Sequence, residues 1–377
     1  MNFKQRGEKL REIITEIRER TFEYEPREVP KINWTQYDQA QIWELATYLD
    51  NVRDLVDEAK RRIERRTPPK ERGPGRPPIN PADITKVLLL QAYTGSPNRV
   101  AEGLLLLFWE KLGINQNFSY KTIERGYDRE AVNEILDEVT RITNETVKGK
   151  EVTFSFDGTG FSASNKENYA AKRQKQNSKK SNDSSDDTVD DHFPKSNSNA
   201  KMSFTYSVIG VGVQYKLISG MATCPNHFVG ETSMFPEVFQ QTISSHPQME
   251  EVLGDGIYAA RWIVDMVSTN DARPYFLPPR NVTFKSKGFS GWWDMLFSLQ
   301  EDPQEWLNHF HMRSISETVN SMIKCRFGNP LRKRLDPRKE TETRLKLVAH
   351  DIRRVGYLEI FKEIKPHWPR KRLWRGP

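Results

Sequence analysis

The sequence predicts an α/β fold in which a mixed sheet is flanked by helices and preceded by an all-helical region. Two changes in hydrophobic spacing carry this prediction. Before residue 150, apolar side chains recur every three or four residues, as they do in amphipathic helices. From residue 151, apolar and polar residues alternate as in strands, and strand-like and helical segments then follow one another. The expected divisions are N-terminal amphipathic helices over 1–66, a basic linker rich in proline and glycine over 67–80, a second helical region over 81–150, an α/β domain over 151–361 and a basic tail over 362–377.

The composition is that of a large, basic chain. Its 377 residues are enough for two or three domains, and 58 lysines and arginines against 51 acidic residues give a net charge of +7, which favours a polyanionic partner. No segment approaches the roughly 18 apolar residues of a membrane span, and the N-terminus lacks the apolar centre of a signal peptide. Only Cys224 and Cys325 are present, which suits a reducing compartment. We therefore expect a cytoplasmic protein that does not associate with a membrane.

The first two helices are expected over 4–22 and 35–66, where isoleucine, leucine and valine fall at helical spacing. The second helix runs into a basic stretch punctuated by proline and glycine. Within that stretch, Gly75-Arg76-Pro77 resembles an AT-hook, in which the side chain of Arg76 would enter the narrow minor groove of DNA rich in A·T pairs. The alternative, which the low complexity of the stretch favours, is a plain solvated linker.

Four more helices complete the region before residue 150. They are expected over 81–93, 97–112, 119–126 and 129–147. Ser96 is placed to cap the second of them, with Pro97 as its first residue. After a tight turn, the short third helix could be the reading helix of a helix-turn-helix motif, with Lys121 and Arg125 facing DNA. An ordinary helical bundle is an equally good interpretation.

The α/β domain begins with three strands that can pair in antiparallel fashion, after which helices and strands alternate. Its elements are expected as a strand over 152–157, two strands within 204–223, a helix over 232–244, a strand over 252–255, a helix over 259–267 and a strand over 274–277. This order matches a ribonuclease-H-like core. Residues 165–200 interrupt it with a lysine-rich and then aspartate-rich stretch that is too polar to order itself, so we expect a disordered insertion at a hairpin tip.

Two aspartates stand at the ends of predicted strands, each beside glycine. Asp157 is followed by Gly158-Thr159-Gly160, and Asp255 lies within Gly254-Asp255-Gly256-Ile257-Tyr258. Asp-Gly is also a common turn sequence, so either aspartate alone has a purely structural explanation. A catalytic interpretation requires a third carboxylate.

The candidate for this third carboxylate is Glu317, in a helix expected over 311–326. At about 100° per residue, Arg313, Asn320 and Lys324 share a face with Glu317, and apolar residues occupy the opposite face. Spacing alone favours a surface helix, in which an arginine and a glutamate four residues apart stabilise the helix by only about 0.2–0.5 kcal/mol.

Taken together, these motifs resemble those of the DDE transposases of bacterial and archaeal insertion sequences. In that family a Tyr is followed after two residues by Arg, after three more by Glu and after six more by Lys. Phe310, Arg313, Glu317 and Lys324 reproduce this spacing, with Phe in place of Tyr. The two aspartate motifs are similar to those of the family, as are Lys324-Cys325-Arg326-Phe327-Gly328 and Ala349-His350-Asp351-Ile352-Arg353, which has Asp where the family usually has Asn. The resemblance covers about residues 75–360 and is specific after residue 150.

The resemblance implies a ribonuclease-H-like catalytic domain that uses two Mg²⁺ ions, with Mn²⁺ as a working substitute. The ions would be held by the three acids Asp157, Asp255 and Glu317. Basic and polar residues of the same helix face would contact DNA near the scissile phosphate, namely Arg313, Asn320 and Lys324.

The implied activity is that of a nucleoid-associated transposase that cleaves double-stranded DNA at the terminal inverted repeats of its element. The freed 3′-hydroxyl then attacks target DNA, and a homodimer is expected on the paired ends. Two alternatives stay open: an element-derived DNA-binding protein without catalysis, and a metal-dependent DNA nuclease that does not join strands. Basic stretches over 332–334 and 365–375 suit non-specific phosphate contact.

Trp292 and Trp293 lie between the second and third acids. In relatives that form a DNA hairpin, an aromatic residue of this region holds a flipped base, so the pair could stack on a base. Packing within the protein is the favoured alternative.

Overall fold

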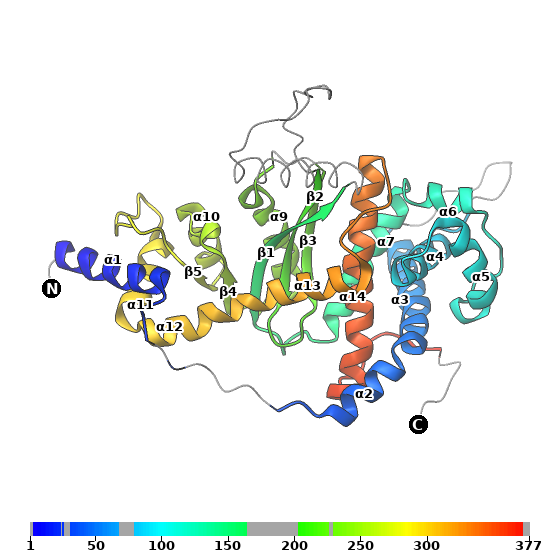
Figure 1. Ribbon diagram of the computed structural model, residues 1–377, viewed down its shortest axis with the longest axis horizontal. Helices are drawn as coiled ribbons and strands as arrows, with labels where there is room; N and C mark the ends of the chain where they lie inside the picture. The colour runs from blue at the N-terminus through cyan, green and yellow to red at the C-terminus, as the bar shows by residue number, and fades with distance from the viewer. Residues whose placement is uncertain are drawn as a thin grey trace, which may run out of the picture.

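The computed structural model describes residues 3–23, 25, 31–67, 79–163, 203–225 and 229–371. The AT-hook residue Arg76 and the insertion expected over 165–200 lie outside these residues. Figure 1 shows a sheet at the centre of the molecule, with a group of helices at each end. No helix of the described ranges is long and apolar enough to cross a membrane.

The predicted α/β fold is confirmed by a mixed sheet in the order β3-β2-β1-β4-β5. The strands are β1 (Thr153–Ser162), β2 (Phe204–Gly212), β3 (Ile218–Cys224), β4 (Glu251–Gly254) and β5 (Arg273–Phe276). β1 to β3 pair in antiparallel fashion, whereas β4 runs parallel to β1 and to β5. The expected end of the first strand at Asp157 is wrong. The strand continues to Ser162 because it stays paired with β2 along its whole length.

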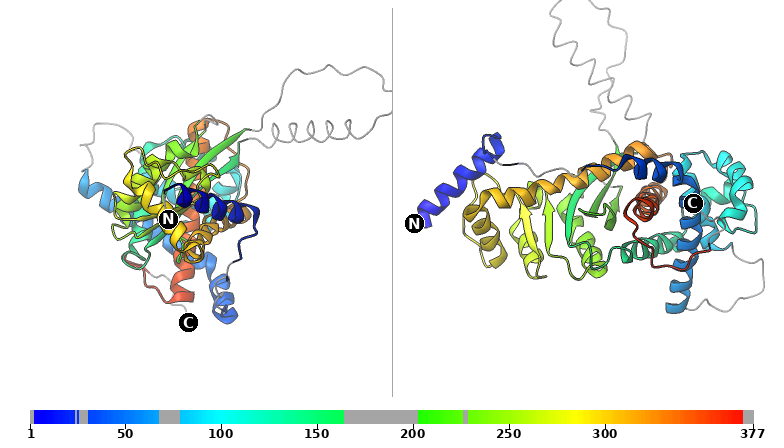
Figure 2. Two further views of the ribbon diagram at one scale, coloured as in Figure 1. Left: turned by 90° about the vertical axis from the view of Figure 1, so that its left-hand side faces the viewer. Right: turned by 90° about the horizontal axis from the view of Figure 1, so that it is seen from below.

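Helices cover both faces of the sheet. They are α9 (Glu231–Ser245), α10 (Arg261–Ser268), α11 (Ser290–Glu301), α12 (Pro303–Phe310) and α13 (Ser314–Phe327). On β1, the Phe156 ring packs against Phe235 of α9, whereas the neighbouring Ser155 hydroxyl bonds to Ser316 of α13. Because successive strand residues point to opposite faces, α9 and α13 lie on opposite sides of the sheet. The right-hand view of Figure 2 shows α13 running across the strands.

The remaining helices form a bundle with its own hydrophobic core beside the sheet. They are α2 (Trp34–Ile42), α3 (Glu44–Arg66), α4 (Pro81–Thr94), α5 (Asn98–Leu112), α6 (Tyr120–Gly126), α7 (Glu130–Glu145) and the long α14 (Asp336–Lys362). Two sequence expectations need correction. The helix expected over 35–66 is interrupted at Trp43, and α5 begins one residue after Pro97, which is its cap residue in place of Ser96.

The first helix, α1 (Phe3–Glu19), lies at the far end of the molecule from α2 and α3 (Figure 1). Its fully buried Leu10 and Ile14 belong to a second core, formed with the sheet, α9 and α11. Nε2 of Gln300 on α11 donates a 2.6 Å hydrogen bond to the Arg6 carbonyl. The helices expected over 1–66 therefore divide between the two cores.

Candidate active site

Two of the predicted acids meet where strands β1 and β4 separate. The parallel pairing between these strands ends at Phe156 and Gly254, so Asp157 and Asp255 are the next residues of the two neighbouring chains. β1 continues beside β2, whereas the chain leaves β4 in a 3-10 turn. Oδ1 of Asp255 accepts a 2.6 Å hydrogen bond from the Gly256 N–H and so caps that turn.

Helix α13 brings polar groups to Asp157 from across the sheet face. Nδ2 of Asn320 donates a 2.9 Å hydrogen bond to Oδ2 of Asp157. Burial raises the pKa of Asp157, the bond from Asn320 lowers it, and the negative charge of Glu317 raises it again. Asp157 and Glu317 therefore act on each other although 160 positions separate them in the sequence (317 − 157).

Glu317 is paired with Arg313 in this structure. Nη1 of Arg313 lies 2.7 Å from Oε1 of Glu317, and the guanidinium stands over the ring of Phe310, 5.1 Å from its centroid. Phe310 is buried and supports Arg313 with its ring face alone, so the missing tyrosine hydroxyl does not change this packing. The Glu317 side chain is 57% exposed and is accessible to a ligand.

Lys324 continues the same helix face toward β1. Its ammonium lies 5.7 Å from the centroid of the Phe161 ring, on the strand that carries Asp157. Burial lowers the pKa of Lys324, and the negative charge of Asp157 raises it. The positive charge is therefore held within the field of the buried aspartate.

Buried serine hydroxyls fix the start of α13 against the sheet. Oγ of Ser155 donates to the Arg313 carbonyl at 2.9 Å and lies 2.8 Å from Oγ of Ser316. Val319 and Ile323 complete the attachment because both are fully buried on the same face of the helix as Ser316. This packing determines which face of α13 is presented to Asp157, as its apolar spacing predicts.

A fourth carboxylate, Glu231, adjoins the two aspartates and was missed in the sequence. It is the first residue of α9, on the other face of the sheet. Burial raises the pKa of Glu231, and the negative charges of Asp157 and Asp255 raise it further. No motif marks Glu231, because its position depends on how α9 packs and not on sequence spacing.

The oxygen donors of this site suit magnesium, which prefers carboxylate and amide oxygens. Oδ1 of Asn320 is buried and has no hydrogen-bond partner among the described residues, and it lies on the side chain that contacts Asp157. A cation would also relieve the repulsion between the acids. Within the described ranges, no three acidic, histidine or cysteine side chains are grouped as a metal site. Glu317 would have to turn from Arg313 toward Asp157 to complete one.

Comparison with known proteins gives one informative relative. The chain is similar to a protein of Archaeoglobus fulgidus described as a probable transposase for insertion sequence element ISA1214. The two are 24% identical over 345 residues, which is 90% of this chain and 94% of the relative. The chain is therefore similar over most of its length to a protein described as a probable insertion-sequence transposase. No protein-family model and no solved structure matches it.

One further motif of the chain has a structural role. Asp351, in the segment that resembles the family's closing helix, is fully buried in α14. Its Oδ1 accepts a 2.9 Å hydrogen bond from the Ile218 N–H, at the first residue of β3. Burial raises the pKa of Asp351, and the bond from Ile218 lowers it. The residue therefore joins α14 to the edge of the sheet, away from the acidic centre.

The two predicted DNA-contacting residues of α6 lie on the helical bundle and not at the acidic centre. Lys121 and Arg125 are both exposed and are four residues apart, so they share one face of the helix. Ser119 caps α6 as expected, accepting a hydrogen bond from the Thr122 N–H. The tight turn expected before α6 is wrong, because the connection over 113–119 is longer than the three- or four-residue turn of a helix-turn-helix.

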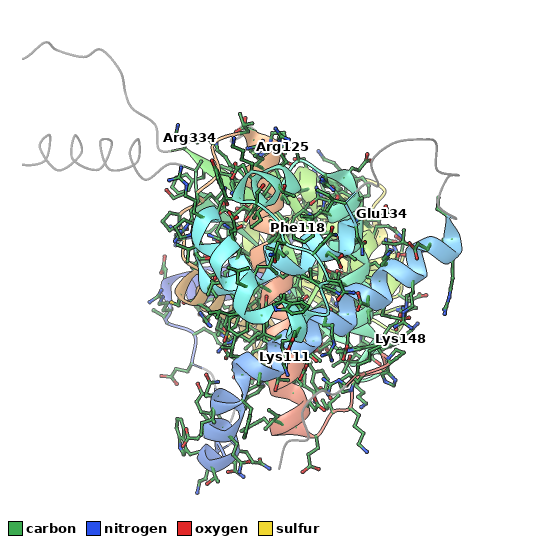
Figure 3. The ribbon with its side chains drawn as sticks, turned by 90° about the vertical axis from the view of Figure 1, so that its right-hand side faces the viewer. Lys111, Phe118, Arg125, Glu134, Lys148 and Arg334 are labelled. Atoms are coloured by element: carbon green, nitrogen blue, oxygen red, sulfur yellow. The ribbon has the colours of Figure 1, made fainter. Side chains whose placement is uncertain are left out.

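A cavity of about 470 Å³ separates α6 from the segment that follows α13. Its basic lining residues are Arg332, Lys333, Arg334, Arg338 and Lys346. Glu124 of α6 accepts hydrogen bonds from Lys333 and Arg338 at 2.7 and 2.5 Å, and so positions both on this wall. Figure 3 shows Arg125 and Arg334 at the same edge of this end of the molecule.

The tryptophan pair occupies packing positions. Trp292 is 2% exposed and donates a 3.1 Å hydrogen bond to the Thr283 carbonyl. Trp293 is half-buried and stacks on Phe297, with ring centroids 5.5 Å apart, while Phe3 of α1 lies 5.7 Å from it. These contacts support the packing interpretation.

Proposed function

We propose that this chain is a DDE transposase with a ribonuclease-H-like catalytic domain. It would cleave DNA at the ends of its element and join the freed 3′-hydroxyl to target DNA. The observation that carries the proposal is the position of Asp157: Asp255 follows the end of the neighbouring strand β4, and the charge of Glu317 on α13 acts on the Asp157 carboxylate. The strand order β3-β2-β1-β4-β5, antiparallel first and parallel afterwards, supports the proposed fold.

Asp157, Asp255 and Glu317 would hold magnesium, for which manganese is a working substitute. When bound, two such cations supply the charge that activates a water or a 3′-hydroxyl and stabilises the oxygen leaving the phosphodiester. Asp157 is the central ligand in this proposal because it lies between Asp255 on the neighbouring strand and Glu317 on the helix.

The residues around the acids would orient the DNA backbone. Arg313, four residues before Glu317, and Lys324, seven residues after it, provide two positive charges on the helix face that carries Glu317. A guanidinium can bind two phosphate oxygens at once, so Arg313 would fix the scissile strand when Glu317 turns away from it. Asn320 would keep the Asp157 carboxylate in place through its 2.9 Å hydrogen bond.

The basic cavity beside α6 provides a second surface for phosphate groups. Arg332 and Arg334 lie on the segment over 328–335, which leads from the end of α13 to α14. Leu331 N–H donates to the carbonyl of Ser162, at the end of β1, so this segment is attached to the strand of Asp157. DNA leaving the acidic centre along β1 would therefore meet these charges.

The experiment is to incubate the full-length protein with DNA from both flanks of its own gene, in magnesium, and to map nicks and joined products. Glu317→Gln keeps the shape of the side chain and removes its charge, so nicking and joining should fall by at least 100-fold. Glu301→Gln, at the exposed end of α11, is the matched control and should leave both products unchanged.

Three results discriminate between the candidate functions. Joined products at inverted repeats that disappear with Glu317→Gln would establish the transposase. Nicks without joined products would identify the nuclease, and binding without any cut would identify the DNA-binding protein.

A further inference from the structure

The carboxylate of Glu231 occupies space that a side chain at position 158 would fill. A Cβ atom built on Gly158 would lie 2.3 Å from Cδ of Glu231 and 2.4 and 2.7 Å from its two carboxylate oxygens. Real Cβ atoms do not approach other atoms this closely. Glu231 therefore reaches the backbone of β1 only because residue 158 is glycine.

The Asp157-Gly158 pair does not have the turn structure that is common for an Asp-Gly sequence. Gly158 is not in a turn, since it lies within β1 and pairs with Val208 of β2. Its neighbour Asp157 points toward α13, so residue 158 faces α9, from which Glu231 comes. Because residue 158 has no side chain, the Glu231 carboxylate on one face of the sheet can approach Asp157, which faces the other side.

A second polar group adjoins Glu231. Tyr258, in the turn that follows Asp255, is fully buried, and its hydroxyl has no hydrogen bond of normal geometry among the described residues. The negative charges of Glu231, Asp157 and Asp255 all act on this phenol. Among the described residues, the group that pairs with this phenol is the Glu231 carboxylate, in poor geometry, as expected of a carboxylate that is also available to a cation.

We propose that Glu231 is a fourth carboxylate of the acidic centre and helps to hold the divalent cation shared by Asp157 and Asp255. Magnesium and manganese accept such all-oxygen ligand sets. A cation would neutralise three neighbouring negative charges, and burial otherwise disfavours two of them, those of Asp157 and Glu231. This inference rests on the proposed function, because it adds a ligand to the same centre.

The test measures Mn²⁺ binding to the full-length protein by isothermal titration calorimetry, without DNA. Asp157→Asn should abolish binding. Glu231→Gln should weaken it by about 10-fold or more, the range found when groups around a metal site are lost. Glu237→Gln, six residues further along α9 and exposed, should bind as the wild type does.

A second pair of variants tests the close approach of Glu231 to residue 158. Gly158→Ala would push Glu231 away while leaving all four acids in the chain, so it should also weaken Mn²⁺ binding. Gly160→Ala is its control on the same strand, because there the new Cβ would meet only the Phe204 ring at 3.2 Å. Melting curves of each variant without metal show whether a loss of binding reflects unfolding.

The outcomes separate this inference from the proposed function. Wild-type affinity in Glu231→Gln, together with loss of binding in Asp157→Asn, would overturn the inference and leave the proposed function intact. Absence of Mn²⁺ binding in the wild type would overturn both.

Discussion

Acidification should destabilise the protein through His246, which is buried at the end of α9. The ring is fully inaccessible, lies 4.8 Å from the Phe154 ring centre to centre, and places Nε2 2.9 Å from Oδ1 of Asn144. Burial and, to a smaller extent, the positive charge of Lys148 lower the pKa of His246 to about 4. The folded state therefore excludes the proton that an unfolded histidine accepts.

The size of the effect follows from the two pKa values. An unfolded histidine has a pKa of about 6.5. The stability contributed by the neutral ring is complete above that pH and is lost as the pH falls toward the folded pKa. Each pH unit by which the pH falls within this window lowers the free energy of unfolding by about 1.4 kcal/mol. A change from about pH 7 to about pH 5 therefore lowers it by about 2 kcal/mol through His246.

Other buried groups also have shifted pKa values, among them His350 and Glu151. Burial lowers the pKa of His350 to about 4, so this residue costs about another 2 kcal/mol. Burial raises the pKa of Glu151 to about 7, and the folded state then holds a proton that the unfolded state releases. Glu151 stabilises the protein by about 2 kcal/mol over the same change, so the effect of His246 is isolated by comparing a variant that lacks it with the wild type.

The assay is urea unfolding at both pH values, followed by circular dichroism and tryptophan fluorescence. His246→Gln keeps a polar group for Asn144 but does not titrate, so its free energy of unfolding should change by about 2 kcal/mol less than that of the wild type. His367→Gln is the control at an exposed histidine. The same pH dependence in His246→Gln and the wild type would refute the reasoning.

Three further predictions concern packing and DNA contact. Ser316→Ala removes the buried partner of Ser155 and should lower the free energy of unfolding by about 1–3 kcal/mol in urea; a change below about 0.5 kcal/mol would contradict the role given to this pair. Gly220→Ala would place a Cβ 2.5 Å from the Val238 carbonyl oxygen and should destabilise the protein by about 1–3 kcal/mol. Gly103→Ala, in open space on α5, should stabilise the protein by up to about 1 kcal/mol. A higher melting temperature for Gly220→Ala than for Gly103→Ala would be inconsistent with the packing. Replacing Arg332 and Arg334 together by glutamine should make the negative slope of log affinity against log salt shallower by about 2 in DNA-binding titrations. An unchanged slope would show that these cavity residues do not contact phosphates.

The order of strands and helices could be predicted because each has a strong local period. Apolar residues at helical spacing located α4, α7, α9 and α13, and the alternation over 152–157 located the start of β1. The end of β1 could not be found in this way. Its Gly158-Thr159-Gly160 segment has the composition of a turn, and only pairing with β2 keeps it extended.

The acids of the site were predictable to different degrees. Asp157, Asp255 and Glu317 stand in motifs whose spacing resembles a known family, so the sequence proposes them together as candidates. Glu231 has no such motif, since its place depends on the close packing of α9 against Gly158. Likewise, nothing in the spacing of α1 indicates that it packs on α11 at the far end of the molecule from α3.

The central claim is that the acidic centre joins DNA strands. The most direct measurement supplies full-length protein with magnesium and pre-cut DNA ends from the flanks of its gene, carrying either a 3′-hydroxyl or a 3′-deoxy terminus. The account predicts joined products from the hydroxyl ends only, and none with Asp157→Asn. Equal products from both termini, or joined products that persist in Asp157→Asn, would contradict it.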